Sequence, residues 1–302
     1  MPFDFVEKLK LAFKNNIYKS SSEEERKKEI IKRALKALSD KPERIVGFLR
    51  FQGVKQKLVQ FLTQSFEIKT GDMLEEFFTS LFGFYYTNLA KNVNGLKCDQ
   101  LFQKNENEIT TIYLIEQKIR DDHDSTKKNG QVKNFENKIT ALRAIYPNAL
   151  IRGYEWFIDD SFQKYPDFYR SQFNDFKTGK EDWFDGGVFY GGDLINTLCE
   201  SETWECFIEA YNVVKREYIS DIGTIIRDYD FDNDSLNIVL PFYKQKREKG
   251  LKIFFDSSYE EVRAALFSDG VMEEKLNTHF RTKRTKTAVF YIEQYKLKHG
   301  EE

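Results

Sequence analysis

A glutamate and a lysine stand two residues apart in the run IEQKI, which is rich in β-branched residues. Alternate residues of a strand point to the same face, so Glu116 and Lys118 project together. Ile115, Gln117 and Ile119 then face the opposite layer. One face of this segment is therefore suited to chemistry, and the other is suited to packing.

A second acidic residue, Asp99, lies 17 positions before Glu116. The segments 96–102 and 109–119 both have strand composition, and a polar run separates them. A hairpin that turns at about residues 105–107 would bring Asp99 beside Glu116. Clustered carboxylates bind magnesium, which neutralises charge on a phosphate and activates water, so this group favours phosphodiester hydrolysis.

The surrounding periodicity predicts an α/β core, with a mixed central sheet flanked by helices. A dense apolar helix is expected from Gly71 to about Asn94, before the hairpin. After a polar stretch, a second helix is expected from Gly130, and Pro147 closes it. A further strand is expected at 149–159, and within 186–198 a short strand is expected to run into a helix that Asp193 could cap.

Both ends of the chain are expected to add helices to this core. Helical spacing of apolar residues runs through residues 1–67, with a break at Asp40–Pro42. Residues 203–302 are mainly helical by the same criterion, and 288–295 is a candidate late strand. We therefore expect a helical region 1–67, a core 68–202 and a helical region 203–302 that forms one unit with the core.

Composition excludes several classes of protein. Hydrophobic residues make up 40% of the chain and charged residues 32%, and no apolar run is long enough for a membrane span. The first residues lack the pattern of a secretory signal, so a cytoplasmic location is expected. Three cysteines without a CxxC pair are interpreted as ordinary buried thiols, and three scattered histidines make a histidine metal site unexpected.

The net charge of −2 results from 47 basic and 49 acidic residues, and it says little about their distribution. Basic residues gather in four segments, which are compatible with phosphate contacts. Solvated surface is the other interpretation of each segment. The segments are 27–33, 118–128, 244–249 and 281–286.

The acid followed by an acid-x-lysine element on the next strand resembles the PD-(D/E)XK nucleases. Asp99 matches the first acid, and Glu116-Gln117-Lys118 matches the second element, although Cys98 stands where the family usually has proline. The resemblance implies that Asp99, Glu116 and the carbonyl group of Gln117 bind Mg²⁺, and that Lys118 orients or deprotonates the attacking water. An isolated EQK triplet means little; its position at the end of a strand and before an amphipathic helix makes the match specific.

Roughly residues 70–200 also resemble certain type II restriction endonucleases, in the segments TGDMLEEFF, IEQKIRDDHDSTKKNGQVKNFENKI and VFYGGDLINTL. This resemblance implies a restriction-endonuclease-like core that cuts double-stranded DNA at a short specific sequence as a homodimer, with a cognate DNA methyltransferase as its functional partner. A repair or recombination nuclease on the same core is one alternative. A non-catalytic DNA-binding protein with a coincidental EQK is the other.

The polar stretch after Lys118 contains hydroxyl, amide and ammonium groups of the kinds that hold phosphates. The DNA-binding candidates are Ser125, Thr126, Lys127, Lys128 and Gln131, and an ordinary exposed loop is the alternative. Glu75 or Glu76 is a candidate for a further carboxylate of the metal site, with solvated helix charge as the other interpretation. The acids Asp121, Asp122 and Asp124, and His123 among them, are interpreted as solvated or capping residues.

Two other motifs carry no assignment. The alternating aspartates of 228–234 lack the glycine and the final glutamate of a calcium-binding loop. GGVFYGG lacks the lysine and hydroxyl residue of a phosphate-binding loop.

Overall fold

The computed structural model describes residues 2–19, 22–40, 53–121, 125–218, 254–260 and 271–301. The chain divides into two compact units. The core unit comprises residues 1–17 and 69–216, and the second unit comprises residues 18–68 and 217–302. The division into three regions that the sequence suggests stays a prediction.

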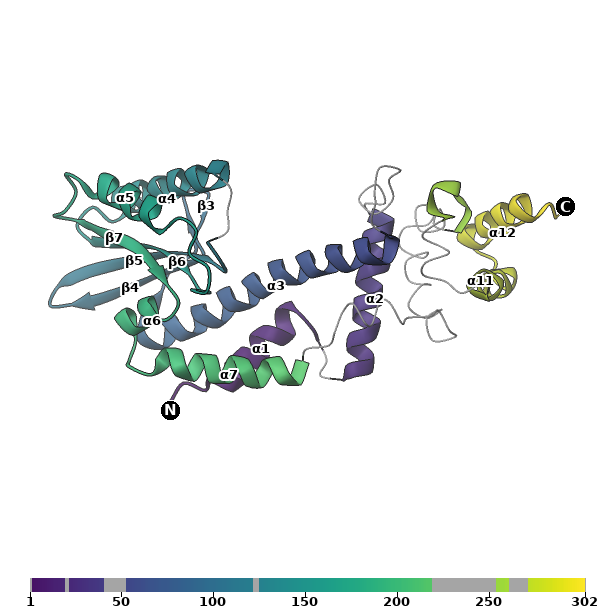
Figure 1. Ribbon diagram of the computed structural model, residues 1–302, viewed down its shortest axis with the longest axis horizontal. Coiled ribbons are helices and arrows are strands. Elements are labelled where there is room, and N and C mark those ends of the chain that lie inside the picture. Colours follow the sequence, from purple (N-terminus) through teal and green to yellow (C-terminus); the bar gives the residue numbers. More distant parts are fainter. Residues whose placement is uncertain are drawn as a thin grey trace. The chain divides into compact units, whose positions relative to one another are not determined.

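A five-stranded mixed sheet forms the centre of the core unit, with the order β1-β4-β5-β6-β7 (Figure 1). The pairs β1/β4 and β4/β5 are antiparallel, whereas β5/β6 and β6/β7 are parallel. Helix α4 connects β5 to β6 and helix α5 connects β6 to β7. The strands are β1 (Thr87–Asn88), β4 (Gln100–Glu106), β5 (Ile109–Lys118), β6 (Leu150–Phe157) and β7 (Phe184–Tyr190), and the connecting helices are α4 (Ser125–Ile145) and α5 (Pro166–Lys177).

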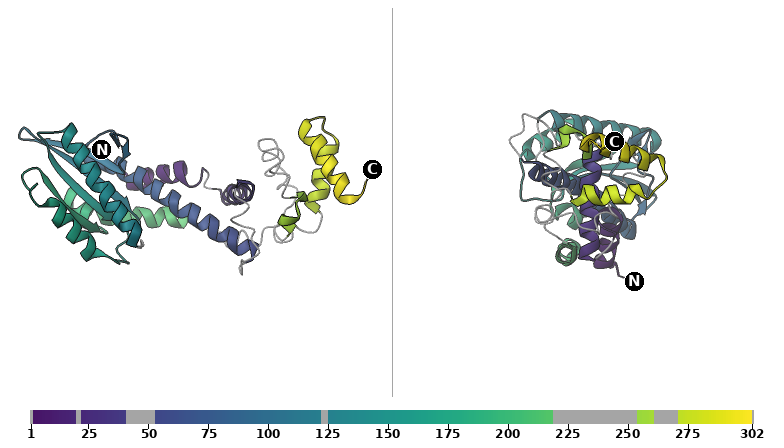
Figure 2. Two further views of the ribbon diagram at one scale, coloured as in Figure 1. Left: turned by 90° about the horizontal axis from the view of Figure 1, so that it is seen from above. Right: turned by 90° about the vertical axis from the view of Figure 1, so that its right-hand side faces the viewer.

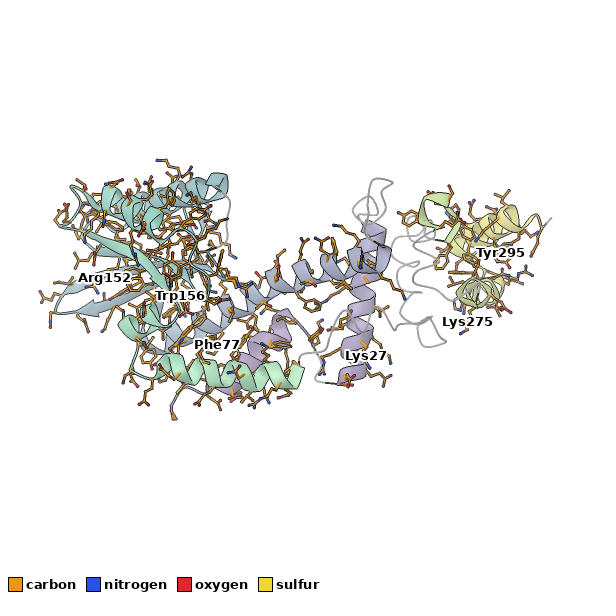
Figure 3. The ribbon with its side chains drawn as sticks, in the orientation of Figure 1. Lys27, Phe77, Arg152, Trp156, Lys275 and Tyr295 are labelled. Carbon is orange, nitrogen blue, oxygen red and sulfur yellow. The ribbon has the colours of Figure 1, made fainter. Side chains whose placement is uncertain are left out.

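Helices cover both faces of this sheet, which confirms the predicted α/β class. Apolar residues of β5, β6 and β7 pack with α4 and α5 on one face. The other face is aromatic, and Phe78 contacts both Trp156 and Phe207 there. Figure 2 shows the layers from two further directions, and Figure 3 marks Phe77 and Trp156 in the aromatic layer. The helices beyond α4 and α5 are α1 (Phe5–Asn16), α3 (Val54–Tyr85), α6 (Asp193–Leu198) and α7 (Thr203–Tyr218).

The β4–β5 hairpin turns through two residues with left-handed backbone, Asn107 at φ 48° and Glu108 at φ 66°. This geometry matches the twist of antiparallel strands. Glu106 therefore pairs with Ile109. The turn was predicted at about residues 105–107, and it lies at Asn107 and Glu108. The same register pairs Gln100 with Ile115.

The second unit is described by itself. Between α2 and the first turns of α3, the guanidinium of Arg33 lies 4.8 Å from the ring centroid of Phe66 and 5.6 Å from that of Tyr18. Phe280 packs against Tyr291 where α11 meets α12. The described elements of this unit include α2 (Glu23–Asp40), the start of α3, a 3-10 turn (Ser257–Tyr259), α11 (Val271–Arg281) and α12 (Lys286–His299).

The helix expected to end near Asn94 ends earlier, at Tyr85. Asn88 donates its side-chain amide to the carbonyl of Thr79, which holds the chain as it turns back from α3. Asn94 and Gly95 have positive φ because they form the turn between β2 (Asn92–Val93) and β3 (Leu96–Lys97). The Asn94–Gly95 pair, which was expected to end the helix, is therefore the turn of a short hairpin.

Four other details of the fold differ from what the sequence predicted. Residues 288–295 are helical, because Ala288 and Tyr291 are buried three residues apart in α12. The cap of α6 is Gly192 and not Asp193. Helix α5 was not predicted, although Tyr169 and Phe173 are buried with helical spacing. Helix α4 begins at Ser125, so the stretch expected as a loop forms its first turns.

Two further expectations concern the three cysteines and the acidic segment 228–234. Of the three cysteines, Cys98 is buried, Cys199 is partly buried and Cys206 is exposed, so only one is an ordinary buried thiol. The aspartates of 228–234 lie outside the described residues, so their interpretation stays a prediction.

Candidate active site

Asp99 directly precedes β4, and the hairpin register sets it beside the end of β5. Its Oδ2 atom accepts a hydrogen bond from the backbone N–H of Gln117 at 2.8 Å. The same oxygen accepts from the Nζ of Lys118 at 3.1 Å. Lys118 also donates to the carbonyl oxygen of Gln117 at 3.0 Å. The acid and the lysine predicted from spacing therefore lie together.

Glu116 joins this group from the same face of β5. Its side chain is largely buried, and its Oε2 atom lies 3.9 Å from the Nζ of Lys118. Its Oε1 atom accepts from the Nζ of Lys138 in α4 at 2.6 Å. Lys138 is 3% exposed, so this ion pair is shielded from water.

A third carboxylate lies on the neighbouring strand. Glu155 in β6 is the register partner of Glu116 and is 1% exposed. Its Oε1 atom is buried and accepts no hydrogen bond from any residue that the structure describes. Burial raises the pKa of Glu155 to about 8, and the ammonium of Lys118 opposes this rise. A buried polar atom without a hydrogen-bond partner is costly, and buried groups with shifted pKa values are frequent at functional sites.

Burial and neighbouring charges also shift the pKa values of Glu116 and Lys118. Burial raises the pKa of Glu116, and the negative charge of Asp99 adds to the rise. Burial alone would lower the pKa of Lys118, but attraction to Asp99, Glu155 and Glu116 outweighs it and raises the pKa. Lys118 is therefore held as an ammonium ion in the arrangement observed.

The side chain of Gln117 faces away from these charges, as strand alternation predicts. Its Oε1 atom accepts from the Nε2 of Gln100 at 3.3 Å. Gln100 is 1% exposed and also donates to the carbonyl of Glu75 in α3. Only the backbone atoms of Gln117 therefore reach the charged group.

A cleft of about 240 Å³ opens beside Asp99 and Lys118. Glu75 of α3 lines it and forms ion pairs with Lys91 at 2.9 Å and with Lys97 at 3.4 Å. Glu76 points elsewhere, because its carboxylate accepts hydrogen bonds from Asn15 and Asn16 in α1. Of the two acids predicted on this helix, the structure brings only Glu75 to the cleft.

The donors at the end of β5 are oxygen atoms, which are the ligands that Mg²⁺ prefers. They are the carboxylates of Asp99 and Glu116 and the carbonyl of Gln117. Over the described part of the chain, no three His, Cys, Asp or Glu side chains are placed to hold a metal ion. A set of two carboxylates and a carbonyl is compatible with that finding, because it contains only two such side chains.

The predicted DNA-binding residues lie on the first turns of α4. The Nζ of Lys128 lies 3.8 Å from the ring centroid of Tyr165 and 4.1 Å from that of Phe168. Gln131 accepts a hydrogen bond from the hydroxyl of Tyr169 at 3.4 Å. The side chains of three others lie outside the described residues: Ser125, Thr126 and Lys127.

Asp121 is not the solvated loop residue that was expected. It is fully buried, and its Oδ2 atom accepts from the backbone N–H of Tyr165 at 2.6 Å and from the hydroxyl of Tyr190 at 3.1 Å. These bonds join the end of β5 to α5 and β7. Asp122, His123 and Asp124 lie outside the described residues.

Sequence reasoning missed Lys138 and Glu155. Each had a signal, because a charge interrupts a buried pattern: Lys138 falls among Phe135, Ile139 and Leu142, which are buried in α4, and Glu155 falls within the apolar strand β6. Charged side chains at such positions need partners or a role.

Residues 84–215 match the family model described as type II restriction endonuclease, HinfI. The match covers β4, β5, α4 and β6, and with them Asp99, Glu116, Lys118 and Glu155. It confirms the predicted similarity to type II restriction endonucleases and indicates a nuclease that acts on DNA. No curated protein matches the chain. In the described residues, no helix is long and apolar enough to cross a membrane.

Proposed function

From the similarity of residues 84–215 to type II restriction endonucleases, we propose that this protein hydrolyses phosphodiester bonds of duplex DNA at a short specific sequence, with Mg²⁺ as cofactor. One observation carries the proposal. Asp99, Glu116 and Lys118 converge at the end of β5, where Lys118 lies 3.1 Å from Asp99 and 3.9 Å from Glu116. An open cleft adjoins Asp99 and Lys118.

We assign the residues as follows. The carboxylates of Asp99 and Glu116 and the carbonyl of Gln117 would hold Mg²⁺, which when bound supplies charge neutralisation at the phosphate and acidifies water. The ammonium of Lys118 donates to both Asp99 and Gln117, so it is fixed at the wall of the cleft. From this place it orients the attacking water and donates a hydrogen bond to the phosphate that is cut.

The same similarity supports three further proposals about partners. The enzyme acts as a homodimer, because two-fold symmetry would match a symmetric recognition site. It works in the cytoplasm. A cognate DNA methyltransferase protects the recognition sequence in the same cell.

The test is digestion of a long sequenced DNA by the purified protein, followed by sequencing of the ends. With Mg²⁺ or Mn²⁺ we expect discrete fragments whose ends share one short sequence. With Ca²⁺ we expect binding without cleavage, because its longer and looser coordination positions water poorly. Asp99→Asn is the matched control for a contaminating nuclease.

Two outcomes would contradict the proposal. Undiminished cleavage after thorough metal removal with EDTA would exclude the metal-dependent mechanism. Random fragments, produced at a rate that depends on Asp99, would instead favour a repair or recombination nuclease on the same core.

A further inference from the structure

Lys138 is a second lysine in the charged group, and it comes from α4 and not from the sheet. Its Nζ lies 2.6 Å from the Oε1 of Glu116, and the residue is 3% exposed. The neighbouring α4 residues Phe135 and Ile139 are buried in the apolar layer against the sheet. The helix backbone at Lys138 is therefore fixed, and the ammonium group is held near Glu116.

Each carboxylate that we assign to the metal already has an ammonium partner. Lys118 bonds to Asp99, and Lys138 bonds to Glu116. Glu155, the third acid of the group, is buried and has an Oε1 atom with no hydrogen bond from a described residue. The ammonium of Lys138 thus stands at one oxygen of Glu116, within the distance at which unit charges interact strongly in a protein.

We propose that Lys138 competes with the divalent cation for Glu116 and thereby sets the metal affinity of the DNA-free protein. This inference rests on the proposed function, since it concerns the same site. A cation that approaches Glu116 is repelled by the ammonium of Lys138, which is buried and cannot move out into water. Metal binding at either oxygen of Glu116 then acts against this ion pair, so the protein without DNA binds metal weakly.

The test compares Mn²⁺ binding to variants without DNA, with free Mn²⁺ followed by electron paramagnetic resonance. For Lys138→Met we expect affinity at least about tenfold higher than that of the wild type, because a nearby positive charge is removed. Lys138→Arg keeps the charge, and we expect its affinity within about twofold of the wild type. Lys133→Met is the matched control on the same helix, since Lys133 is 72% exposed and pairs with Glu136.

The gain must depend on Glu116. In a Glu116→Gln background, Lys138→Met should give no increase, so a double-mutant cycle isolates the competition from a general loosening of the fold. If Lys138→Met does not fold by circular dichroism, Lys138→Gln replaces it, because the amide keeps a donor without the charge. Mn²⁺ affinity that is unchanged or lowered in the folded variant would overturn the inference.

Failure of this inference can be told from failure of the proposed function. If the wild type binds Mn²⁺ through Glu116 and cuts DNA, but Lys138→Met binds no more tightly, only the role of Lys138 is wrong. If neither protein shows binding that depends on Glu116, and neither cuts DNA, the metal site itself is wrong.

Discussion

One face of the sheet carries two buried groups that are neighbours along the same strands but differ in character. Ile112 and Leu114 of β5 and Ile151 of β6 are fully buried under α4. Further along the same face stand Glu116 and Glu155, which are 6% and 1% exposed. Burial is nearly equal in the two groups, so it does not decide which residue type the position takes.

The two groups differ in what they contribute to stability. Each buried apolar side chain stabilises the fold by about 1.5–3 kcal/mol. A buried carboxylate destabilises it unless a partner compensates, and even a good ion pair often contributes nothing net. The chain supplies two buried or half-buried lysines, Lys118 and Lys138, and still leaves an oxygen of Glu155 without a described partner. Such an arrangement is expected where chemistry, and not stability, determines the residues.

The largest expected effect is the loss of DNA cleavage when a residue of the charged group is replaced. Asp99→Ala, Glu116→Ala and Lys118→Ala should each lower the cleavage rate by about a thousandfold or more, because each removes a group that acts on the phosphate, the water or the metal. Each variant should still fold, although Glu116→Ala should be the least stable, because it leaves the buried ammonium of Lys138 without its partner. The measurement is single-turnover cleavage of plasmid DNA, with circular dichroism of the same samples. Near wild-type cutting by any one folded variant would show that the assignment is wrong.

The control comes from the apolar group, two residues before Glu116. Leu114→Ala should lower the free energy of unfolding by about 2–5 kcal/mol, because it leaves a cavity beneath α4. Its folded fraction should still cut DNA at a rate within about tenfold of the wild type. Urea unfolding and the cleavage assay together check both statements. If Leu114→Ala lost as much cleavage as Glu116→Ala, the apolar and charged groups would not differ in their role in activity.

The sequence predicted the parts of this site that depend on strand alternation. The spacing of Glu116 and Lys118, together with one hairpin, was enough to bring Asp99 beside them, because register follows from a two-residue turn. Lys138 and Glu155 could not be placed in the same way. Their approach depends on how α4 crosses the sheet and on which strand pairs with β5, and neither is a local property of the sequence.

The same reason explains the errors in the fold. Strand composition at residues 288–295 was overruled by packing of α12, in which Tyr291 is fully buried. The Asn-Gly pair at 94–95 has a left-handed backbone in either a hairpin or a helix end, so residue type alone could not distinguish them. The mixed sheet itself was predictable, because alternation of strands and amphipathic helices follows local periodicity.

A smaller effect should appear in the pH dependence of stability, and it comes from Glu155. Its folded-state pKa is about 8, above the ordinary value near 4.5, so the folded protein binds the extra proton between these pH values. Stability should therefore fall as pH rises from about 4.5 to 8, by a few kcal/mol at most. Glu155→Gln should lack this fall.

Urea unfolding of both proteins at a series of pH values is the measurement. The slope, and not the absolute stability, is the readout, because glutamine brings its own hydrogen-bonding needs. Glu205→Gln, at an exposed position of α7, should keep the wild-type slope. An identical slope in Glu155→Gln would mean that Glu155 titrates normally and is better solvated than its burial indicates.

The smallest effect is expected outside both groups, at the first turns of α4. Lys127→Ala combined with Lys128→Ala should weaken binding to specific and non-specific DNA alike, because these lysines would bind phosphates. The magnitude of the log K versus log salt slope should fall by about one to two, since each phosphate that a lysine neutralises adds about 0.9 to it. The slope is measured by anisotropy titrations in Ca²⁺, with Lys133→Ala, at an exposed position of the same helix, as the control.

The ammonium of Lys128 lies over the rings of Tyr165 and Phe168, so Lys128→Ala alone tests a purely structural role. In that case, thermal stability would fall while the salt slope stayed unchanged. A weakening confined to the specific sequence would instead place these lysines at base edges.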